Sequence, residues 1–232
     1  MPQTWQELGG GCFVLPGNEA RVLVNTGLVV GAQRALVIDT GCGPRHAAEI
    51  LAAVRTVTTL PLVGVNTHAH WDHFFGNATF KEAGLTELWA HKAAAQTIAD
   101  TGESQRRFVA GVEPDMAAAT GSGTEIVLPT HHVGAETVVL DLGGVEVELF
   151  TLGLGHSSGD LMVGAPGVLF AGDVLEVGAA PDYEDAFPPE WAAVLRRLAG
   201  MGEKYPVMVP GHGHPVDAGF AAHMAEVVAA AQ

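Results

Sequence analysis

The sequence has 232 residues, of which 48% are hydrophobic and 16% charged, and its formal net charge is −15. This much apolar material is enough for one large core, so we expect a single domain over residues 1–232. The acidic balance argues against nucleic-acid binding, because proteins that bind phosphate backbones need a basic surface.

The N-terminal residues lack the basic start and apolar run of a secretory signal. No apolar stretch approaches the roughly 18 residues that a membrane-spanning helix needs. We therefore expect a cytoplasmic protein that does not contact a membrane. Cys12 and Cys42 are too few for a disulfide framework or a thiolate metal cluster, and the sequence assigns them no role.

In chain order, short apolar runs alternate with alanine-rich runs of helical period, a pattern typical of mixed α and β domains. The first half predicts strands at 21–30, 34–39, 61–67 and 88–90 and helices at 43–57, after Asn77 and at 91–108, with a looser segment at 109–123. The second half predicts a hairpin at 136–142 and 144–152, then strands in DLMVGA, GVLFAGD and YPVMVPG, and helices at 189–201 and 218–231. The similar order in the two halves predicts two α/β halves whose sheets face each other.

Several of these expected strands lead into side chains that can bind a metal ion. There are seven such residues: His68, His70, Asp72, His73, His156, Asp173 and His212. Imidazole and carboxylate ligands without thiolate suit zinc, and also iron or manganese. Seven ligands are more than one tetrahedral ion can use and are about right for two ions that share one carboxylate.

The spacing of the first four residues supports this interpretation. His68 and His70 are two positions apart, so in extended backbone they point the same way and can share one ion. Asp72 and His73 can reach a second ion. Neutral imidazoles that donate their lone pairs to a cation no longer repel one another, so the ions should hold the cluster together.

The motifs THAHWDH, GHSSGD, FAGD and PGHGHP, between residues 22 and 217, resemble those of the metallo-β-lactamase-fold hydrolase superfamily. The resemblance implies an α/β fold, a four-layer αβ/βα sandwich in which two facing mixed β-sheets are flanked by helices. It further implies a dinuclear site in which His68, His70 and His156 hold the first metal, Asp72, His73 and His212 hold the second, Asp173 bridges them, and Asp39 supports the ligands from outside.

This resemblance also implies a mechanism. Two Zn²⁺ ions about 3.5–4 Å apart would hold a bridging hydroxide, which attacks the carbonyl of an ester, thioester, lactone or amide. Asp72 is the expected catalytic residue, because it can accept a proton and pass it to the leaving group. The expected substrate is a small molecule.

The position of this chain among the subfamilies is less specific. β-Lactamases of this fold generally replace the bridging aspartate, which is intact here as Asp173, so β-lactam hydrolysis is a secondary hypothesis. Lactone-hydrolysing relatives typically carry tyrosine where this chain has Glu176, and glyoxalase II-like thioesterases use a basic patch where residues 174–191 are acidic. The sequence looks closest to quinoprotein-relay and general hydrolases of this fold, whose substrates are poorly defined.

Three residues near the ligands are candidates for substrate contact. Trp71 and Phe75 could form an apolar wall or pack in the core, and His214 could donate a hydrogen bond to substrate or face solvent. Two other functions stay open: a mononuclear iron oxidoreductase of the persulfide dioxygenase type, and a noncatalytic metal-binding protein. The sequence does not specify the physiological substrate, the native metal or the oligomeric state.

Overall fold

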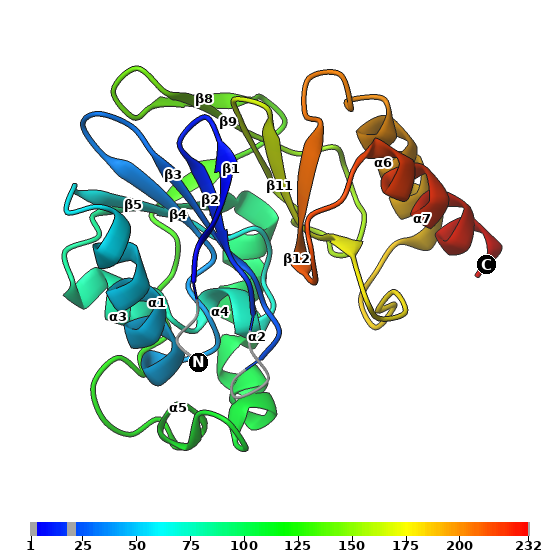
Figure 1. Cartoon of the computed structure of the whole chain (residues 1–232). Helices are drawn as coiled ribbons and strands as arrows, with labels where there is room; N and C mark the ends of the chain where they lie inside the picture. The colour runs from blue at the N-terminus through cyan, green and yellow to red at the C-terminus, as the bar shows by residue number, and fades with distance from the viewer. Residues whose placement is uncertain (1–3, 18–21, 232) are drawn as a thin grey trace.

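Two mixed β-sheets form the centre of the computed structural model, which describes residues 4–17 and 22–231 (Figure 1). The larger sheet has seven strands in the order β1-β2-β3-β4-β5-β6-β7. Their bounds are Gln6–Gly9, Cys12–Leu15, Thr26–Val30, Ala35–Ile38, Leu62–Val65, Glu87–His91 and His131–Val133. Strands β1 to β4 pair antiparallel, whereas the pairs from β4 to β7 are parallel.

The smaller sheet has five strands in the order β12-β11-β10-β9-β8. Strands β8 to β12 span Val138–Asp141, Glu146–Phe150, Met162–Ala165, Val168–Glu176 and Val207–His212. Only β11 and β12 pair in parallel among these five. Both sheets are therefore mixed, as the resemblance implies.

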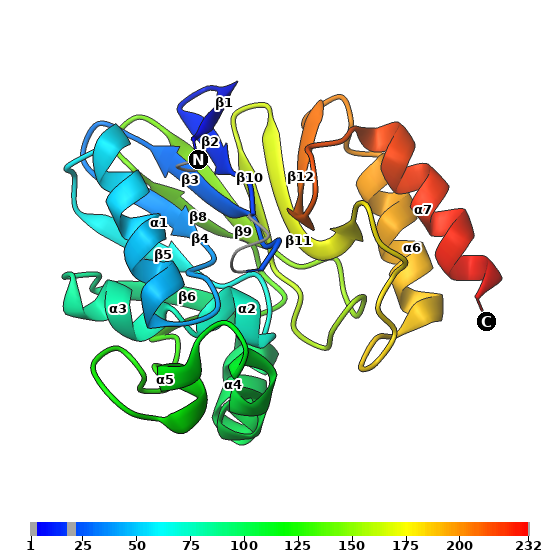
Figure 2. The same cartoon turned by 60° about the horizontal axis from the view of Figure 1, so that its bottom comes forward.

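Helices cover the outer face of each sheet. The larger sheet carries α1 (Pro44–Val57), α2 (Trp71–Phe74), α3 (Asn77–Glu82), α4 (Lys92–Gln105), the 3₁₀ helix η1 (Arg106–Val109) and α5 (Pro114–Ala118) on its side of the molecule. The smaller sheet is covered by α6 (Pro188–Ala199) and α7 (Ala218–Ala230), as Figure 2 shows. This arrangement confirms the predicted sandwich of two facing sheets between helical layers.

The core lies in three layers that follow from the sequence pattern. Between the sheets, apolar side chains of one sheet such as Leu36 and Val63 pack against those of the other, such as Val163 and Phe170. A Cβ atom at Gly27 would lie 2.7 Å from the Phe170 ring, so glycine is needed where the sheets approach this closely. The outer layers form because α1, α6 and α7 bury apolar faces on the sheets.

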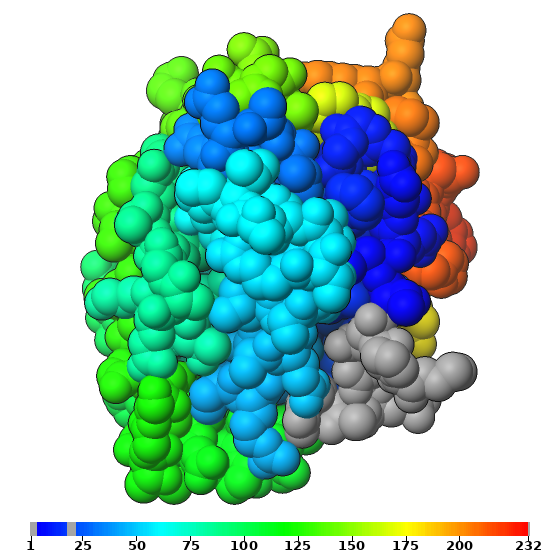
Figure 3. Space-filling model, turned by 60° about the vertical axis from the view of Figure 1, so that its left-hand side comes forward, coloured from blue at the N-terminus to red at the C-terminus, as the bar shows by residue number. Residues whose placement is uncertain are grey.

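The N-terminal hairpin of β1 and β2 forms one edge of the larger sheet. In Figure 3 the hairpin of β1 and β2 lies beside α1. Trp5 connects the two, because its Nε1 donates a hydrogen bond of 3.0 Å to the carbonyl oxygen of Ala53. Neither this hairpin nor β7 was expected from the sequence, since β1 is mostly exposed and β7 has only three residues.

Several predicted boundaries differ from the structure. The strand expected at 21–30 begins only at Thr26, after an isolated bridge between Val24 and His212, and residue 21 lies outside the described residues. The helix expected at 91–108 ends as α4 at Gln105 and continues as η1, and α5 occupies part of the segment expected to be loose. Among the described residues, no helix is long and apolar enough to cross a membrane.

Candidate metal centre

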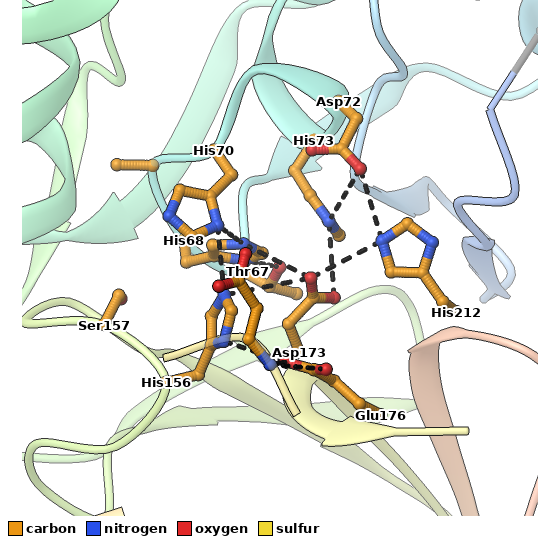
Figure 4. A network of polar contacts seen from close by, with 12 residues as sticks. Thr67, His68, His70, Asp72, His73, His156, Ser157, Asp173, Glu176 and His212 are labelled. Atoms are coloured by element: carbon orange, nitrogen blue, oxygen red, sulfur yellow. Dashed lines mark hydrogen bonds and ion pairs between the residues drawn. The ribbon is translucent and has the colours of Figure 1, made fainter. Parts of the chain in front are cut away.

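The seven candidate ligands converge at one edge of the two sheets (Figure 4). The chain leaves β5 and passes through His68 and His70 into the single turn of α2, which carries Asp72 and His73. The other three come from the second sheet: His156 follows β9, Asp173 lies in β11, and His212 ends β12. Residues distant in sequence thus form two groups, within each of which the ligand atoms lie no more than 4.8 Å apart.

The sequence suggested that Asp173 ends its strand. In the structure it lies inside β11, which continues to Glu176. The pairing of β11 with β12 shifts register on both sides of Gly172, whose φ is +55°. A bulge of this kind re-aims a side chain and is favoured by glycine, which adopts positive φ without strain. The irregularity therefore explains how a residue within a strand points into the centre.

The first group contains His68, His70, His156 and Asp173. His70 Nδ1 lies 3.0 Å from Nε2 of His68 and 3.0 Å from Nε2 of His156. Asp173 Oδ2 lies 3.8 Å from both Nε2 atoms. Tetrahedral zinc with bonds of about 2.0–2.1 Å places its ligand atoms roughly 3.3 Å apart, so these four atoms could hold one ion.

The second group contains Asp72, His73 and His212. Asp72 Oδ2 lies 3.2 Å from His212 Nε2 and 3.7 Å from His73 Nε2. Asp173 also reaches this group, because its Oδ1 is 3.3 Å from His73 Nε2 and its Oδ2 is 3.4 Å from His212 Nε2. One carboxylate, that of Asp173, therefore contacts both groups.

Three buried atoms in this centre lack a hydrogen bond of good geometry to a described residue: His73 Nε2, His156 Nδ1 and Asp173 Oδ1. His156 Nδ1 lies 3.1 Å from the Glu176 carboxylate, and His73 Nε2 and Asp173 Oδ1 lie 3.3 Å from each other. His73 Nε2 and Asp173 Oδ1 are metal-ligand atom types with lone pairs, and a cation between them would satisfy both. The residues present therefore fit the divalent metal that the donor set implies.

Asp39 lies directly behind the second group, where the resemblance places it. Its Oδ2 is 2.8 Å from His73 Nδ1, and its two oxygens accept hydrogen bonds from the backbone N–H and the hydroxyl of Thr67. Its φ is +63°, a left-handed conformation that is uncommon for a residue with a side chain. The Asp39 contact orients the ring of His73 so that Nε2 faces the centre.

Two further carboxylates contact candidate ligands in the same way and were missed from the sequence. Glu176 Oε1 lies 3.1 Å from His156 Nδ1, and Asp185 Oδ1 lies 3.1 Å from His70 Nε2. Carboxylates in this position fix the orientation of a ligating imidazole and raise its basicity. The sequence showed that Glu176 stands where lactone-hydrolysing relatives have tyrosine, and that residues 174–191 are acidic. Neither feature identifies the histidine that each carboxylate contacts.

The charges at the centre oppose one another strongly. Burial alone would lower the pKa of His212 and of His156, but Asp173 together with Asp72 raises that of His212 to about 10, and Glu176 with Asp173 raises that of His156 to about 9. Burial and the neighbouring His73 hold the pKa of His68 well below its usual range. In the absence of metal, the carboxylates therefore keep His156 and His212 protonated, and metal binding would displace these protons.

A cavity of about 640 Å³ opens in front of these ligands. One wall comes from α2, α4 and η1 and includes Trp71, while the other comes from residues 176–185. The ring of Trp71 stacks on Phe108 with centroids 6.5 Å apart. His214 lines a separate cavity of about 430 Å³ that shares His212 with the first.

Phe75 does not fit the expected substrate contact. Its side chain is 1% exposed and packs with Phe74, Ala94 and Ile98, because α2 ends after one turn and the chain folds inward beneath α4. Phe75 is therefore a core residue, the alternative that the sequence left open.

This placement predicts a stability effect at Phe75. Phe75→Ala should lower the free energy of unfolding by about 3–5 kcal/mol, because it leaves a cavity in a packed core. Trp71→Ala, which alters the cavity wall, is the matched control and should cost less. Denaturant unfolding of the two variants checks this, and equal losses would contradict the assignment of Phe75 to the core.

Comparisons with known proteins agree with this architecture. Residues 20–212 match the family model of the metallo-β-lactamase superfamily. The chain is 31% identical over 195 residues to an acyl-coenzyme A thioesterase, MBLAC2, of *Gallus gallus*, covering 76% of this chain and 67% of the relative. It is 25% identical over 214 residues to a type 2 metallo-β-lactamase of *Bacillus cereus*, covering 88% and 73%.

Solved structures show the same fold. A metallo-β-lactamase from *Pontibacter korlensis* superposes with a TM-score of 0.78 at 21% identity, covering 98% of this chain and 99% of that one. The FIM-1 metallo-β-lactamase from *Pseudomonas aeruginosa*, in its mono-zinc form, gives 0.74 at 19% identity, covering 98% and 96%. The matched region of the family includes all seven candidate ligands. The chain therefore belongs to the metallo-β-lactamase superfamily of metal-dependent hydrolases.

Proposed function

We propose that this protein binds two divalent cations, most suitably zinc, and hydrolyses an ester, thioester, lactone or amide carbonyl of a small molecule. The observation that carries the proposal is the position of Asp173, whose carboxylate lies within 3.8 Å of ligand nitrogens in both groups. A carboxylate shared in this way is typical of sites that hold two ions close together.

The donor set supports zinc as the first choice. Besides the shared Asp173, the candidate ligands are five imidazoles and one carboxylate, and no thiolate is present among them. Zinc accepts this mixture, and so do iron and manganese. The FIM-1 relative is described in a mono-zinc form, which concerns that protein and supports zinc here by likeness of fold.

The residues would divide the work as follows. Two cations, when bound, would lower the pKa of a water molecule to about 7 and polarise the carbonyl oxygen of the substrate. In this proposal His68, His70 and His156 with Asp173 hold one ion, and Asp72, His73 and His212 with Asp173 hold the other. The Asp72 carboxylate borders the cavity, where it can accept the proton of the attacking water and return it to the leaving group.

The outer carboxylates keep the imidazoles in place. Asp39, Glu176 and Asp185 each contact the far nitrogen of a candidate ligand, as described above. These contacts reduce the number of ring orientations and so pre-organise the site before the cations arrive. Trp71 and Phe108 give one wall of the cavity a stacked aromatic surface.

Hydrolysis of a β-lactam is a second candidate, supported by the relative from *Bacillus cereus*. The thioesterase of *Gallus gallus* supports a thioester in the same way, at higher identity over a shorter stretch. A mononuclear iron oxidoreductase is a third alternative, and the set of seven candidate ligands counts against it because such a site uses fewer.

Metal analysis combined with a substrate panel tests the proposal. We expect about two zinc ions per chain after loading and dialysis, hydrolysis of at least one ester, thioester, lactone or β-lactam, and loss of that activity with chelator. Re-addition of zinc should restore it. One iron per chain with oxygen uptake would instead establish the oxidoreductase, and a fully loaded but inert protein would favour a noncatalytic role.

A further inference from the structure

The cavity in front of the metal centre is rich in carboxylates. Besides Asp72 and Asp173, its lining includes Glu176, Asp182, Glu184 and Asp185, and among the described residues that line it Arg107 is the one Lys or Arg. Two divalent cations would offset four of these six negative charges. Together with the single guanidinium, they would still leave the cavity with an excess of negative charge.

These carboxylates are not equivalent. Glu176 and Asp185 contact His156 and His70. Asp182 and Glu184 lie further out on the loop between β11 and α6 (yellow in Figure 2), and both are exposed. The loop is held in place because the backbone N–H of Asp182 donates to Glu176 Oε2 at 3.0 Å. Asp182 and Glu184 thus carry charge at the cavity wall without contacting a candidate ligand.

The opposite wall also offers acceptors. The hydroxyl of Thr101 donates to the carbonyl of Thr97, and that of Ser104 donates to the carbonyl of Thr101, each at 2.8 Å. Their hydrogens are therefore used within α4, and neither hydroxyl offers a donor to the cavity. The Thr101 oxygen already accepts from Gln105 Nε2 at 3.0 Å, so the Ser104 oxygen is the acceptor on this wall. Trp71 adds an aromatic face, which attracts cations.

The candidate metal ligands mark this cavity as the place where a substrate would bind. Asp72, Asp173 and His212 line it together with Asp182 and Glu184. The carboxylates of residues 182 and 184 therefore lie in the wall of the cavity that leads to the metal centre, and their charge acts on whatever enters it.

We propose that the substrates of this enzyme carry a cationic group, such as a quaternary or protonated amine, a few atoms from the carbonyl that is cleaved, and that Asp182 and Glu184 attract that group. The inference rests on the proposed function for the position of cleavage. Anionic substrates are disfavoured by the same charges. This chain would thus differ from an acyl-coenzyme A thioesterase, whose substrate carries phosphates, and from a β-lactamase, whose substrate carries a carboxylate.

Three thioesters that differ in charge test the proposal on the zinc-loaded full-length chain. They are acetylthiocholine, its uncharged isostere S-(3,3-dimethylbutyl) thioacetate, and acetyl-coenzyme A. We expect kcat/KM for acetylthiocholine to exceed that of the neutral isostere by at least about fivefold at low salt. The ratio should shrink in about 0.5 M salt, where exposed charges are screened, and acetyl-coenzyme A should be the poorest substrate.

A charge-removing variant assigns the preference to residues. In the double variant Asp182→Asn/Glu184→Gln, kcat/KM for acetylthiocholine should fall to about that for the neutral thioester. The fall should come mainly from a higher KM for acetylthiocholine, while the kinetics of the neutral thioester change little. Glu136→Gln is the matched control, since Glu136 is exposed and lies before β8, away from the cavity lining. It should leave the ratio unchanged.

Calorimetric titration with choline separates this proposal from the proposed function. If neither these thioesters nor any substrate of the wider panel is cleaved, but choline binds the zinc-loaded chain and binds the double variant more weakly, the cation site stands and the proposed hydrolysis fails. If thioesters are cleaved with no cationic preference, or the double variant keeps that preference, the cation site is wrong and the hydrolysis stands. Absence of choline binding together with inertness toward the whole substrate panel would overturn both proposals.

Discussion

Asp173→Ala is expected to remove most of the bound metal and to lower kcat/KM by at least about a thousandfold. Asp173 is the one carboxylate that approaches both groups of candidate ligands, with distances of 3.3 to 3.8 Å to four imidazole nitrogens. Its loss would deprive each ion of a ligand and leave the four histidines without the negative charge between them. Metal content after dialysis and hydrolysis by the zinc-loaded protein measure the two effects.

Two further variants make this result interpretable. Asp173→Asn has nearly the same shape and keeps the backbone bulge, so it separates the loss of charge from a packing defect; we expect it to bind metal almost as poorly as the alanine variant. Asp100→Ala removes an exposed carboxylate on α4 and should leave metal content and activity unchanged. Full metal content in either Asp173 variant would show that the bridging assignment is wrong.

The residues that gather at the centre could be predicted because their identity is visible in the sequence and the edge of a sheet brings strand ends together. His68 and His70 follow β5, and His212 ends β12, as the pattern indicated. Asp173 was found for its identity, although its strand continues for three residues beyond it. The bulge at Gly172 that aims it inward depends on pairing with β12, which a local pattern does not contain.

The supporting contacts could not be predicted because they join distant segments through side chains. Asp185 meets His70 across 115 positions of sequence, and Gln105 donates from α4 to the carbonyl oxygen of Ala69 at 2.9 Å. Many carboxylates and amides in the chain were equally plausible partners. Asp39 was proposed because a resemblance supplied the position, whereas Glu176 departs from the related pattern and so received no role.

The short elements show the same limit in the fold. The layers of the sandwich follow from long apolar strands and amphipathic helices, whose pattern survives in the sequence. The strand β1 is mostly exposed and is defined by its pairing with β2 and by the turn at Gly9 to Gly11, where φ is positive at all three residues. The sequence left Phe75 undecided between cavity wall and core because a single helical turn gives too few residues for a periodicity to reveal which face is buried.

Chelated protein is expected to lose stability as the pH rises from about 6.5 to 8.5, by about 1–3 kcal/mol per pH unit. Burial opposes the charged form of His156 and His212, but the neighbouring carboxylates raise their pKa values to about 9 and about 10. Protons that bind these two histidines more tightly in the folded state than in the unfolded chain stabilise the fold. This contribution is complete below 6.5, the pKa of histidine in the unfolded chain. That stabilisation is lost as the pH approaches the folded values, and denaturant unfolding in chelator measures the slope.

Zinc-loaded protein should behave differently over the same range. Metal replaces the protons on these histidines, so the folded state no longer binds more protons than the unfolded chain and stability should be nearly constant above about pH 7. Zinc added to chelator-free apoprotein near pH 7.5 should release about three protons, because carboxylates raise the pKa of His73 as well as those of His156 and His212. Titration calorimetry in buffers of different ionisation enthalpy can count them. His212→Gln should reduce both the slope of the apoprotein and the proton release, whereas His223→Gln, exposed on α7, should change neither. Parallel slopes for the chelated and loaded forms would mean that the ions do not bind at these histidines.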